Sequence, residues 1–250
     1  MLTGQRQQRI LETLGHDGQI VASRLAAELA VSEDTVRRDL AELARQGLLL
    51  RVHGGALPAA PAAADLSVRR QVSIPEKAAI ARAAAARIRP GQVVLLDGGT
   101  TAVALARALP HGLAATIVTH SPAVAVELEG HACEVILIGG RLFRHSMVAV
   151  GASALEAIGR IRADLYVMGV TGLESTVGLT TGDAEEAGVK RALMRAAAET
   201  LVLASPEKVG AASPHVIAPV TAAATVITTV GAPAEALARI AALGVEIVRI

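Results

Sequence analysis

Seven short apolar runs between residue 93 and the end of the chain limit the possible folds more than any other feature. They occupy residues 93–96, 116–119, 134–138, 165–169, 201–204, 225–228 and 245–250. Each run is apolar almost throughout instead of alternating with polar residues, which is typical of strands buried on both faces. Helical patterns lie between most of them, at residues 101–109, 122–128, 184–198 and 233–243. This order predicts an α/β fold in which helices cover a mainly parallel sheet.

The composition limits which residue types can form the core and which kinds of partner the chain can bind. Hydrophobic residues make up 52% of the chain but aromatic residues only 1%, so the core must consist of Ala, Val, Leu and Ile. The net charge is +1, so a site for a polyanion has to be local. Cys133 is the single cysteine, which excludes an intramolecular disulfide. We expect a cytoplasmic protein with no membrane partner, because no long apolar span or signal region is evident.

A break in composition divides the chain. The stretch LPAAPAAAD at residues 57–65 has no apolar periodicity and is interpreted as a linker. We therefore expect a mostly helical domain at residues 1–56, a linker at 57–72 and an α/β domain at 73–250. At the start of the larger domain, Ser73 and Glu76 have the spacing of a capping box, and Pro75 suits a first helical turn.

The segment VSEDTVRRDL at residues 31–40 predicts a helix whose two adjacent arginines point outward. Val36, Leu40 and Leu43 form one apolar stripe, and Arg37 and Arg38 lie roughly 100° to 200° around the helix from it. A second amphipathic helix precedes it after only a short turn, so the pair predicts a helix-turn-helix. The following LLLRVHGGA favours a strand and a Gly-Gly turn, which suggests a wing.

The plain alternative is that the arginine pair is only a solvated surface. Residues 1–56 carry seven Lys and Arg residues and seven Asp and Glu residues, so the domain is formally neutral. Binding to DNA phosphates would then depend on where the arginines lie and not on their number.

A glycine-rich turn near the start of the larger domain is a candidate phosphate-binding site. In LLDGGTTAVALARAL at residues 95–109, a strand ends at Asp97 and two glycines lead into a helix. Converging N–H groups at a helix N-terminus can hold a phosphate, although such a turn is also common between a strand and a helix without any ligand. It is neither a Walker loop nor a dinucleotide fingerprint. Polar residues after other strands, at 119–121, 139–141 and 169–172, could line the same crevice.

Residues 31–56 resemble the winged helix-turn-helix of the DeoR family of bacterial transcriptional regulators, whose hallmark is VSxxTxRRDLxxLxxxGxLxRxHGGA. The larger domain carries the landmarks DGGTT, VTHS, ILIGGRL, ADLYVMGVTGL and GLTTGDAEEAGVKRALM, and so resembles the family's sensor domain, which is itself similar in fold to ribose-5-phosphate isomerase. The resemblance implies a DNA-binding regulator, expected to be a repressor of a carbohydrate operon, that responds to a phosphorylated sugar.

The resemblance also implies site residues. Operator contacts are expected from the recognition helix and the wing, at Ser32, Thr35, Arg37, Arg38, Arg51, His53 and Gly54. The phosphate is expected at Asp97, Gly98, Gly99, Thr100 and Thr101. The sugar is expected near Thr119, Ser121, Gly139, Gly140 and Arg141, with Glu186, Lys190 and Lys208 on the remaining wall. For the last group, a solvated helix face with pairing four residues apart is an equally simple interpretation.

The departures from the family pattern lie in the domain expected to bind the effector, not in the domain expected to bind DNA. The family often has Asp where this chain has Thr171, and Asp-Ser-Ser-Lys where this chain has Ser-Pro-Glu-Lys at residues 205–208. These changes leave open which sugar phosphate, or which other phosphorylated metabolite, is bound.

Two other functions stay open. An isomerase-like enzyme with an accessory N-terminal domain could use Asp97, Glu185, Glu186, Lys190 and Lys208 for proton transfer. A sensor that acts through protein contacts alone is the third. We expect no enzyme activity, no cofactor and no metal, because the histidines lack metal-ligand spacing. Operator reading by one small module is weak, so we expect a homodimer or homotetramer.

Overall fold

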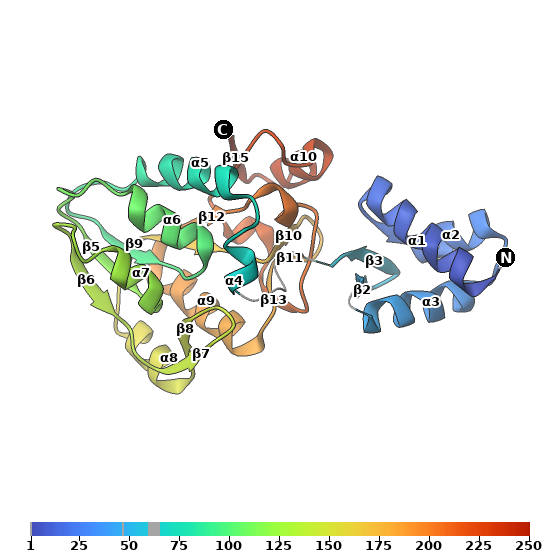
Figure 1. Cartoon of the computed structure of the whole chain (residues 1–250), viewed down its shortest axis with the longest axis horizontal. Helices are drawn as coiled ribbons and strands as arrows, with labels where there is room; N and C mark the ends of the chain where they lie inside the picture. Colours follow the sequence, from blue (N-terminus) through green and yellow to red (C-terminus); the bar gives the residue numbers. More distant parts are fainter. Residues whose placement is uncertain (1, 47, 60–65) are drawn as a thin grey trace.

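The computed structural model describes residues 2–46, 48–59 and 66–250 in two parts along the long axis of the molecule (Figure 1). A smaller N-terminal part, which we call the head, spans residues 2–59 without Gly47. A larger part, which we call the body, begins at Leu66. Residues 60–65, most of the stretch interpreted as a linker, lie outside the described residues. Of the rest of that stretch, Leu57 and Pro58 belong to a strand, and Leu66–Arg69 form the short helix α4.

The head is a winged helix-turn-helix, as the sequence predicts. Helices α1 (Thr3–Asp17), α2 (Ala22–Leu29) and α3 (Glu33–Arg45) pack around a small apolar core, and strands β1 (Ile20–Val21), β2 (Leu49–Val52) and β3 (Gly55–Pro58) form an antiparallel sheet. The expected stripe on α3 is buried at Val36, Leu40 and Leu43. Gly55 is needed in β3, because a Cβ there would lie 1.7 Å from the carbonyl oxygen of Ile20.

The body is built on a seven-stranded sheet, and its strands coincide with the seven apolar runs. They are β4 (Val93–Leu96), β5 (Thr116–Thr119), β6 (Glu134–Leu137), β9 (Ala163–Gly169), β12 (Ala197–Leu203), β14 (Thr225–Thr228) and β15 (Glu246–Arg249). Their order is β15-β14-β12-β9-β4-β5-β6, and every neighbouring pair is parallel. The α/β class with a parallel sheet is therefore confirmed.

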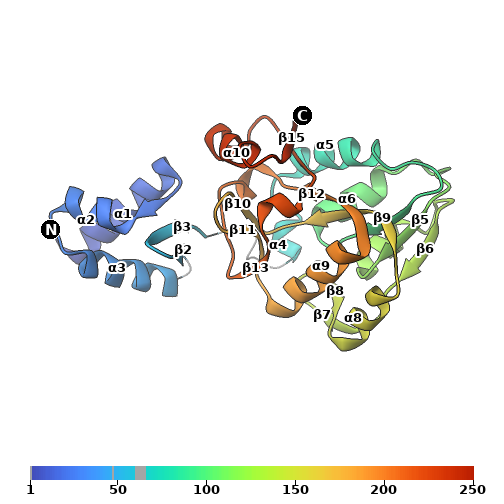
Figure 2. The same ribbon diagram turned by 180° about the vertical axis from the view of Figure 1, so that it is seen from behind.

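Helices cover both faces of this sheet. On one face lie α5 (Ile74–Ala85), α6 (Thr100–Ala108) and α7 (Pro122–Glu127), and Figure 1 looks onto α6 and α7. On the other lie α8 (Ala152–Gly159), α9 (Ala184–Ala196) and α10 (Ala234–Ala241), with α9 in front in Figure 2. Val94 and Leu96 belong to the apolar core on the α5–α6 face of the sheet and Leu95 to the core on the α8–α9 face, as the alternation of side chains along a strand requires.

Two predictions for the body need correction. Ser73 does not form a capping box, because its φ is 50° and its hydroxyl donates to Glu207 Oε2 at 2.9 Å. The helix expected to reach residue 198 ends at Ala196, where the chain passes directly into β12. Alanines favour a helix, but parallel pairing of Ala197 with Ala163 extends the strand toward them.

The sequence interpretation missed the small antiparallel elements above the carboxyl ends of the sheet. They are the hairpin β7 (Arg141–Phe143) and β8 (Val148–Val150), and a sheet of β10 (Gly172–Glu174), β11 (Gly178–Thr181) and β13 (His215–Ala218). The short 3-10 helices η2 (Pro206–Lys208) and η3 (Val220–Ala222) complete this region. The head meets it through an isolated bridge between Ala59 and Ala212.

Candidate functional site

A pocket lies at the end of β4, where the strand order of the sheet reverses. The next strands in the chain, β5 and β6, lie on one side of β4, and the later strands β9, β12, β14 and β15 lie on the other. Ligands of open parallel sheets bind outside the carboxyl ends of the strands at such a switch point. The pocket lies there, between the turn that follows β4 and the residues Gly169–Thr171 that follow β9.

The turn after β4 forms one wall of the pocket and has the geometry of an anion site. Gly99 precedes α6 with a φ of 96° and no side-chain cap, so the first N–H groups of the helix are left for a ligand. A Cβ at Gly98 would lie 2.2 Å from the side chain of Val148, so only glycine lets β8 approach this turn. The hydroxyl of Thr101 is buried and has no hydrogen-bond partner within the described chain.

A buried charge cluster forms the floor. Lys190 Nζ pairs with Asp97 Oδ2, donates to the carbonyl oxygen of Gly169 at 2.9 Å and lies 3.6 Å from Glu186 Oε1. Burial works against its charge, but the carboxylates of Asp97 and Glu186 outweigh burial, and the pKa of Lys190 is raised. Asp97 also accepts a hydrogen bond from the backbone N–H of Gly169 at 2.7 Å, which joins the two strand ends.

His120 lies beneath this cluster and is fully buried. Its Nε2 is 3.5 Å from Asp97 Oδ1, but burial lowers the pKa of His120, so the ring is neutral near pH 7 and the contact is not an ion pair. The His120 ring nitrogens, Asp97 Oδ1 and the Tyr166 hydroxyl have no hydrogen-bond partner within the described residues.

Lys208 is the pocket's available cation. Burial lowers its pKa to about 8, so it is largely protonated at pH 7. Of the residues that the structure describes, none forms a hydrogen bond or ion pair with its ammonium group. The adjacent Glu207 carboxylate is held by the hydroxyls of Ser205 and Ser73, and despite burial these bonds lower the pKa of Glu207.

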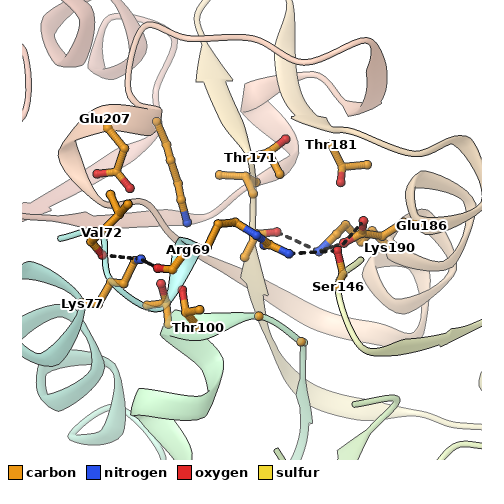
Figure 3. A pocket seen from close by; sticks show the side chains of 16 residues that line it. Arg69, Val72, Lys77, Thr100, Ser146, Thr171, Thr181, Glu186, Lys190 and Glu207 are labelled. Carbon is orange, nitrogen blue, oxygen red and sulfur yellow. Dashed lines mark hydrogen bonds and ion pairs between the residues drawn. The ribbon is translucent and has the colours of Figure 1, made fainter. Parts of the chain in front are cut away.

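The remaining polar residues come from segments far apart in the chain (Figure 3). Lys77 on α5 donates to the carbonyl oxygens of Arg69 at 2.6 Å and Val72 at 2.5 Å. Burial lowers the pKa of Lys77. Ser146, in the turn of the β7–β8 hairpin, donates to Glu186 Oε2 at 3.3 Å. Four cationic side chains and two carboxylates line the pocket, which favours an anionic ligand: Arg69, Lys77, Lys190, Lys208, Glu186 and Glu207.

The structure brings most, but not all, of the expected ligand residues together. Those that line the pocket are Gly98, Gly99, Thr100, Thr101, Glu186, Lys190 and Lys208, and Asp97 supports them from below. The other five lie outside: Thr119, Ser121, Gly139, Gly140 and Arg141. Arg141 is exposed and pairs with Glu185. The β7–β8 hairpin is the reason, because it covers the end of β5 through Ala149 N–H to His120 O at 2.7 Å and Ser121 Oγ to Met147 O at 3.3 Å.

Sequence reasoning missed four polar pocket residues, namely Arg69, Lys77, Ser146 and Thr181, and considered Thr171 and Glu207 only as departures from the family pattern. Lys77 offered a signal, as one lysine inside an alanine-rich helix. Arg69 and Ser146 offered none, because their segments join the pocket only through the fold.

The head presents a second candidate site on α3 and the wing. Ser32 is the N-cap of α3 and accepts the N–H of Thr35 at 3.2 Å, while its hydroxyl lies 2.8 Å from Thr35 Oγ1. Ser32 thus has a structural role whether or not it meets DNA. His53 and Gly54 are exposed in the turn between β2 and β3.

Ion pairing distinguishes the arginines of the head. Five of them contact carboxylates: Arg6 with Asp39, Arg9 with Glu12, Arg24 with Glu28, Arg37 with Glu33 and Arg45 with Glu42. Arg38 and Arg51 are exposed and have no such partner among the described residues. Arg38 lies on α3 and Arg51 on the wing, so the two uncompensated guanidinium groups belong to the two elements that a winged helix uses on DNA.

Two further features of the described residues concern metals and membranes. No group of three or more His, Cys, Asp or Glu side chains is arranged to hold a metal ion. None of the helices has the length and apolarity needed to cross a bilayer.

Two family models match the chain. The model of the DeoR C-terminal sensor domain matches residues 72–229, and the model of the DeoR-like helix-turn-helix domain matches residues 6–60. The first range contains most of the pocket, and the second contains α3 and the wing.

Individual proteins are similar as well. The HTH-type transcriptional regulator GlpR of Haloferax volcanii is 37% identical over 213 residues, which cover 84% of this chain and 83% of that protein. The glycerol-3-phosphate regulon repressor of Escherichia coli is 34% identical over 208 residues, or 82% of each chain. The solved structure of ribose 5-phosphate isomerase A from Methanocaldococcus jannaschii is similar over 53% of this chain and 52% of that one, with a TM-score of 0.40 and 17% identity.

Proposed function

Because the chain belongs to the DeoR family of transcriptional regulators, we propose that it represses a carbohydrate operon and that a phosphorylated sugar bound in the body controls its affinity for operator DNA. The head would bind duplex operator DNA, and the pocket at the end of β4 would bind the effector. Two observations support this proposal, one for each site.

For the DNA site, the supporting observation is the pair of unpartnered arginines. Arg38 would reach base edges or phosphates from α3, and Arg51 the backbone from the wing, with Ser32, Thr35, Arg37, His53 and Gly54 at the rim of the contact. The head is formally neutral, so its affinity for DNA would depend on the positions of these two arginines and not on its net charge.

For the effector site, Lys208 carries the proposal. A buried ammonium group that no carboxylate contacts directly is unfavourable, and a bound phosphate would supply that contact in addition to the more distant Glu207 charge. The N-terminus of α6 lies on the same pocket and would bind the same group through its N–H donors. Glu186, Thr171 and Thr181 also line the pocket and would hydrogen-bond the hydroxyl groups of a sugar or polyol.

The effector class follows from this chemistry and from the relatives. A relative of this chain is named for the glycerol-3-phosphate regulon, so glycerol 3-phosphate is the first probe to test. Ribose 5-phosphate and fructose 6-phosphate extend the panel to longer chains. Thr119, Ser121, Gly139, Gly140 and Arg141 would then contact the effector only if the β7–β8 hairpin moved, so we do not assign them to the site.

Calorimetric titration of the full chain tests the effector site. We expect saturable binding of at least one of the three phosphorylated probes, and no binding of glycerol. Lys208→Gln should weaken the binding, whereas Arg162→Gln, a change in an exposed residue that does not line the pocket, should not. Failure of all three probes to bind would contradict a sugar-phosphate effector.

An isomerase is the alternative function. Of the five groups expected to transfer protons, Asp97 and Lys190 are buried and paired with each other, and Glu185 pairs with Arg141 outside the pocket, whereas Glu186 and Lys208 line it. Because the similar proteins are named as transcriptional regulators, we propose that the chain is not an enzyme and uses no cofactor. Substantial turnover of ribose 5-phosphate or fructose 6-phosphate by the purified protein would overturn this.

Operator recognition also has consequences for assembly and location. A winged head of this size reads only one half-site, so we propose a homodimer or homotetramer on repeated half-sites, in the cytoplasm where DNA and phosphorylated metabolites meet. Sedimentation equilibrium should give at least twice the mass of one chain, and a monomer at micromolar concentration would contradict the assembly.

A further inference from the structure

Arg69 connects the pocket with the chain segment that leads to the head. It is the last residue of α4, which begins directly after residues 60–65. Its guanidinium Nη2 donates to the carbonyl oxygen of His145 at 3.0 Å and to Ser146 Oγ at 3.3 Å, in the turn between β7 and β8. Figure 3 shows Arg69 extending across the pocket toward Ser146.

The Arg69 guanidinium also lies close to the candidate anion site at the N-terminus of α6. A Cβ added at Gly99 would lie 3.8 Å from Arg69 Nη1, so the arginine reaches the N-terminus of α6. A phosphate bound at that N-terminus would lie within reach of Arg69. The His145 carbonyl and the Ser146 hydroxyl that accept from Nη2 are uncharged, and a guanidinium binds a phosphate more strongly than a neutral oxygen.

The segment that carries Arg69 is held in place largely by pocket residues. Lys77 Nζ bonds the carbonyl oxygens of Arg69 and Val72, and Glu207 accepts the hydroxyl of Ser73. Lys77 and Glu207 both line the pocket. Residues 69–73 are thus tied to groups whose electrostatic surroundings change when an anion enters.

We propose that Arg69 transmits occupancy of the pocket to the head: a bound phosphate draws its guanidinium away from His145 and Ser146, and α4 moves with it. The inference rests on the proposed function of the same pocket and adds the regulatory residue. An effector changes an equilibrium only through contacts that differ between two states, and exchange of the His145 and Ser146 oxygens for a phosphate oxygen at Arg69 Nη2 is such a difference.

The test compares Arg69→Ala with Arg70→Ala in the full chain. Arg70 is the adjacent arginine, but it is exposed and does not line this pocket. The measured quantity is the ratio of operator affinities without and with saturating glycerol 3-phosphate, ribose 5-phosphate or fructose 6-phosphate, by fluorescence anisotropy on a promoter fragment. Calorimetry establishes saturation for each variant.

We expect a ratio of about tenfold or more for the wild type and for Arg70→Ala, within the usual range of allosteric coupling. Arg69→Ala should bind the probe about tenfold more weakly, consistent with a lost charge-assisted bond, and still saturate. At saturation its ratio should fall below twofold. Arg69→Lys, which keeps the charge but loses the planar fork, should give an intermediate ratio.

The outcomes separate the two proposals. If the wild type responds and Arg69→Ala keeps the full ratio at saturation, Arg69 is not the transmitter, and the proposed function stands. A variant that cannot be saturated also overturns the inference, because Arg69 would then be a binding group only. A wild-type ratio of one with all three probes overturns the proposed function and this inference together.

A second measurement does not depend on the variants. In the wild type, the probe should change amide hydrogen exchange in residues 66–73 as well as in residues 98–103. A change confined to residues 98–103 would overturn the inference.

Discussion

A guanidinium that already holds a carboxylate has to release it before it can bind a DNA phosphate or base. Arg37 is in that position, since Glu33 Oε1 lies 2.6 Å from its Nη2. Arg38 has no such partner within the described chain, so its whole charge is available. The order of importance of the two adjacent arginines therefore follows from pairing, which the sequence alone does not reveal.

We predict that Arg38→Ala weakens operator binding by about 2 kcal/mol, as expected for a lost arginine contact to a base. Arg37→Ala should have a clearly smaller effect. Gel-shift titration at fixed salt measures both, and the reverse order, or unchanged affinity for Arg38→Ala, would contradict the assignment.

The ionisation of Lys208 predicts how effector binding depends on pH. Its pKa is lowered to about 8 in the empty pocket, and a phosphate binds the protonated form. Raising the pH from 7 to 9 removes that proton, so affinity for a phosphorylated probe should fall about tenfold. The phosphate itself is already a dianion over this range.

Calorimetry at pH 7, 8 and 9 measures this dependence. Lys208→Gln should bind more weakly at pH 7 and show little change up to pH 9. If the affinity of Lys208→Gln for the probe also fell tenfold between pH 7 and pH 9, a group other than Lys208 would be responsible for the pH dependence.

At the scale of single residues, the sequence predicts groups that lie within one local motif. Gly98 to Thr101 and Lys208 line the pocket, as expected from their motifs. Arg69 and Ser146 could not be found in this way, because separate segments carry them and only the tertiary fold brings them together.

In the head, a largely buried ion pair joins α1 to α3 in addition to the apolar core. Arg6 on α1 and Asp39 on α3 form two hydrogen bonds, of which the one between Nη2 and Oδ1 is 3.1 Å long. The Asp39 carboxylate raises the pKa of Arg6. The pair fixes α3 against α1, and so sets the direction in which Arg38 points.

We predict that Asp39→Asn lowers the free energy of unfolding of the head by roughly 2 kcal/mol, because it leaves the Arg6 charge without its partner. Glu42→Gln is the control, since its pair with Arg45 is exposed and should contribute little. Calorimetric unfolding would detect the difference. Equal stability of the two variants would contradict a structural role for Asp39.

The success of the sequence interpretation also differs between elements. The seven strands of the parallel sheet were predictable because burial on both faces demands continuous apolar runs. The small strands β7, β8, β10, β11 and β13 were not, since they have three or four residues each, which is too short for a periodic pattern to distinguish a strand. These strands decide which expected residues reach the pocket, so the errors in the site follow from the missed elements.

At the scale of the whole molecule, the head and the pocket lie at opposite sides of residues 60–65 and must communicate through neighbouring structure. The described contacts offer two routes, the bridge between Ala59 and Ala212 and the segment from Arg69 to Ser73. Both are bonded to residues that line the pocket: the neighbours of Ala212, Ala211 and Ser213, bond Lys208 and Thr171, and the second route carries Arg69 itself into the pocket. Family membership was predictable from the motifs of both parts, whereas this route was not, because it depends on contacts made by a segment without a motif.

We propose that this chain binds operator DNA and that a phosphorylated sugar weakens or strengthens that binding. Anisotropy titration of the full protein on a promoter fragment upstream of its own coding region tests this most directly, with glycerol 3-phosphate, ribose 5-phosphate and fructose 6-phosphate added in turn. We predict sequence-specific binding in the nanomolar range that at least one probe changes about tenfold. Binding no tighter than to random DNA, or specific binding that none of the probes alters, would contradict the account.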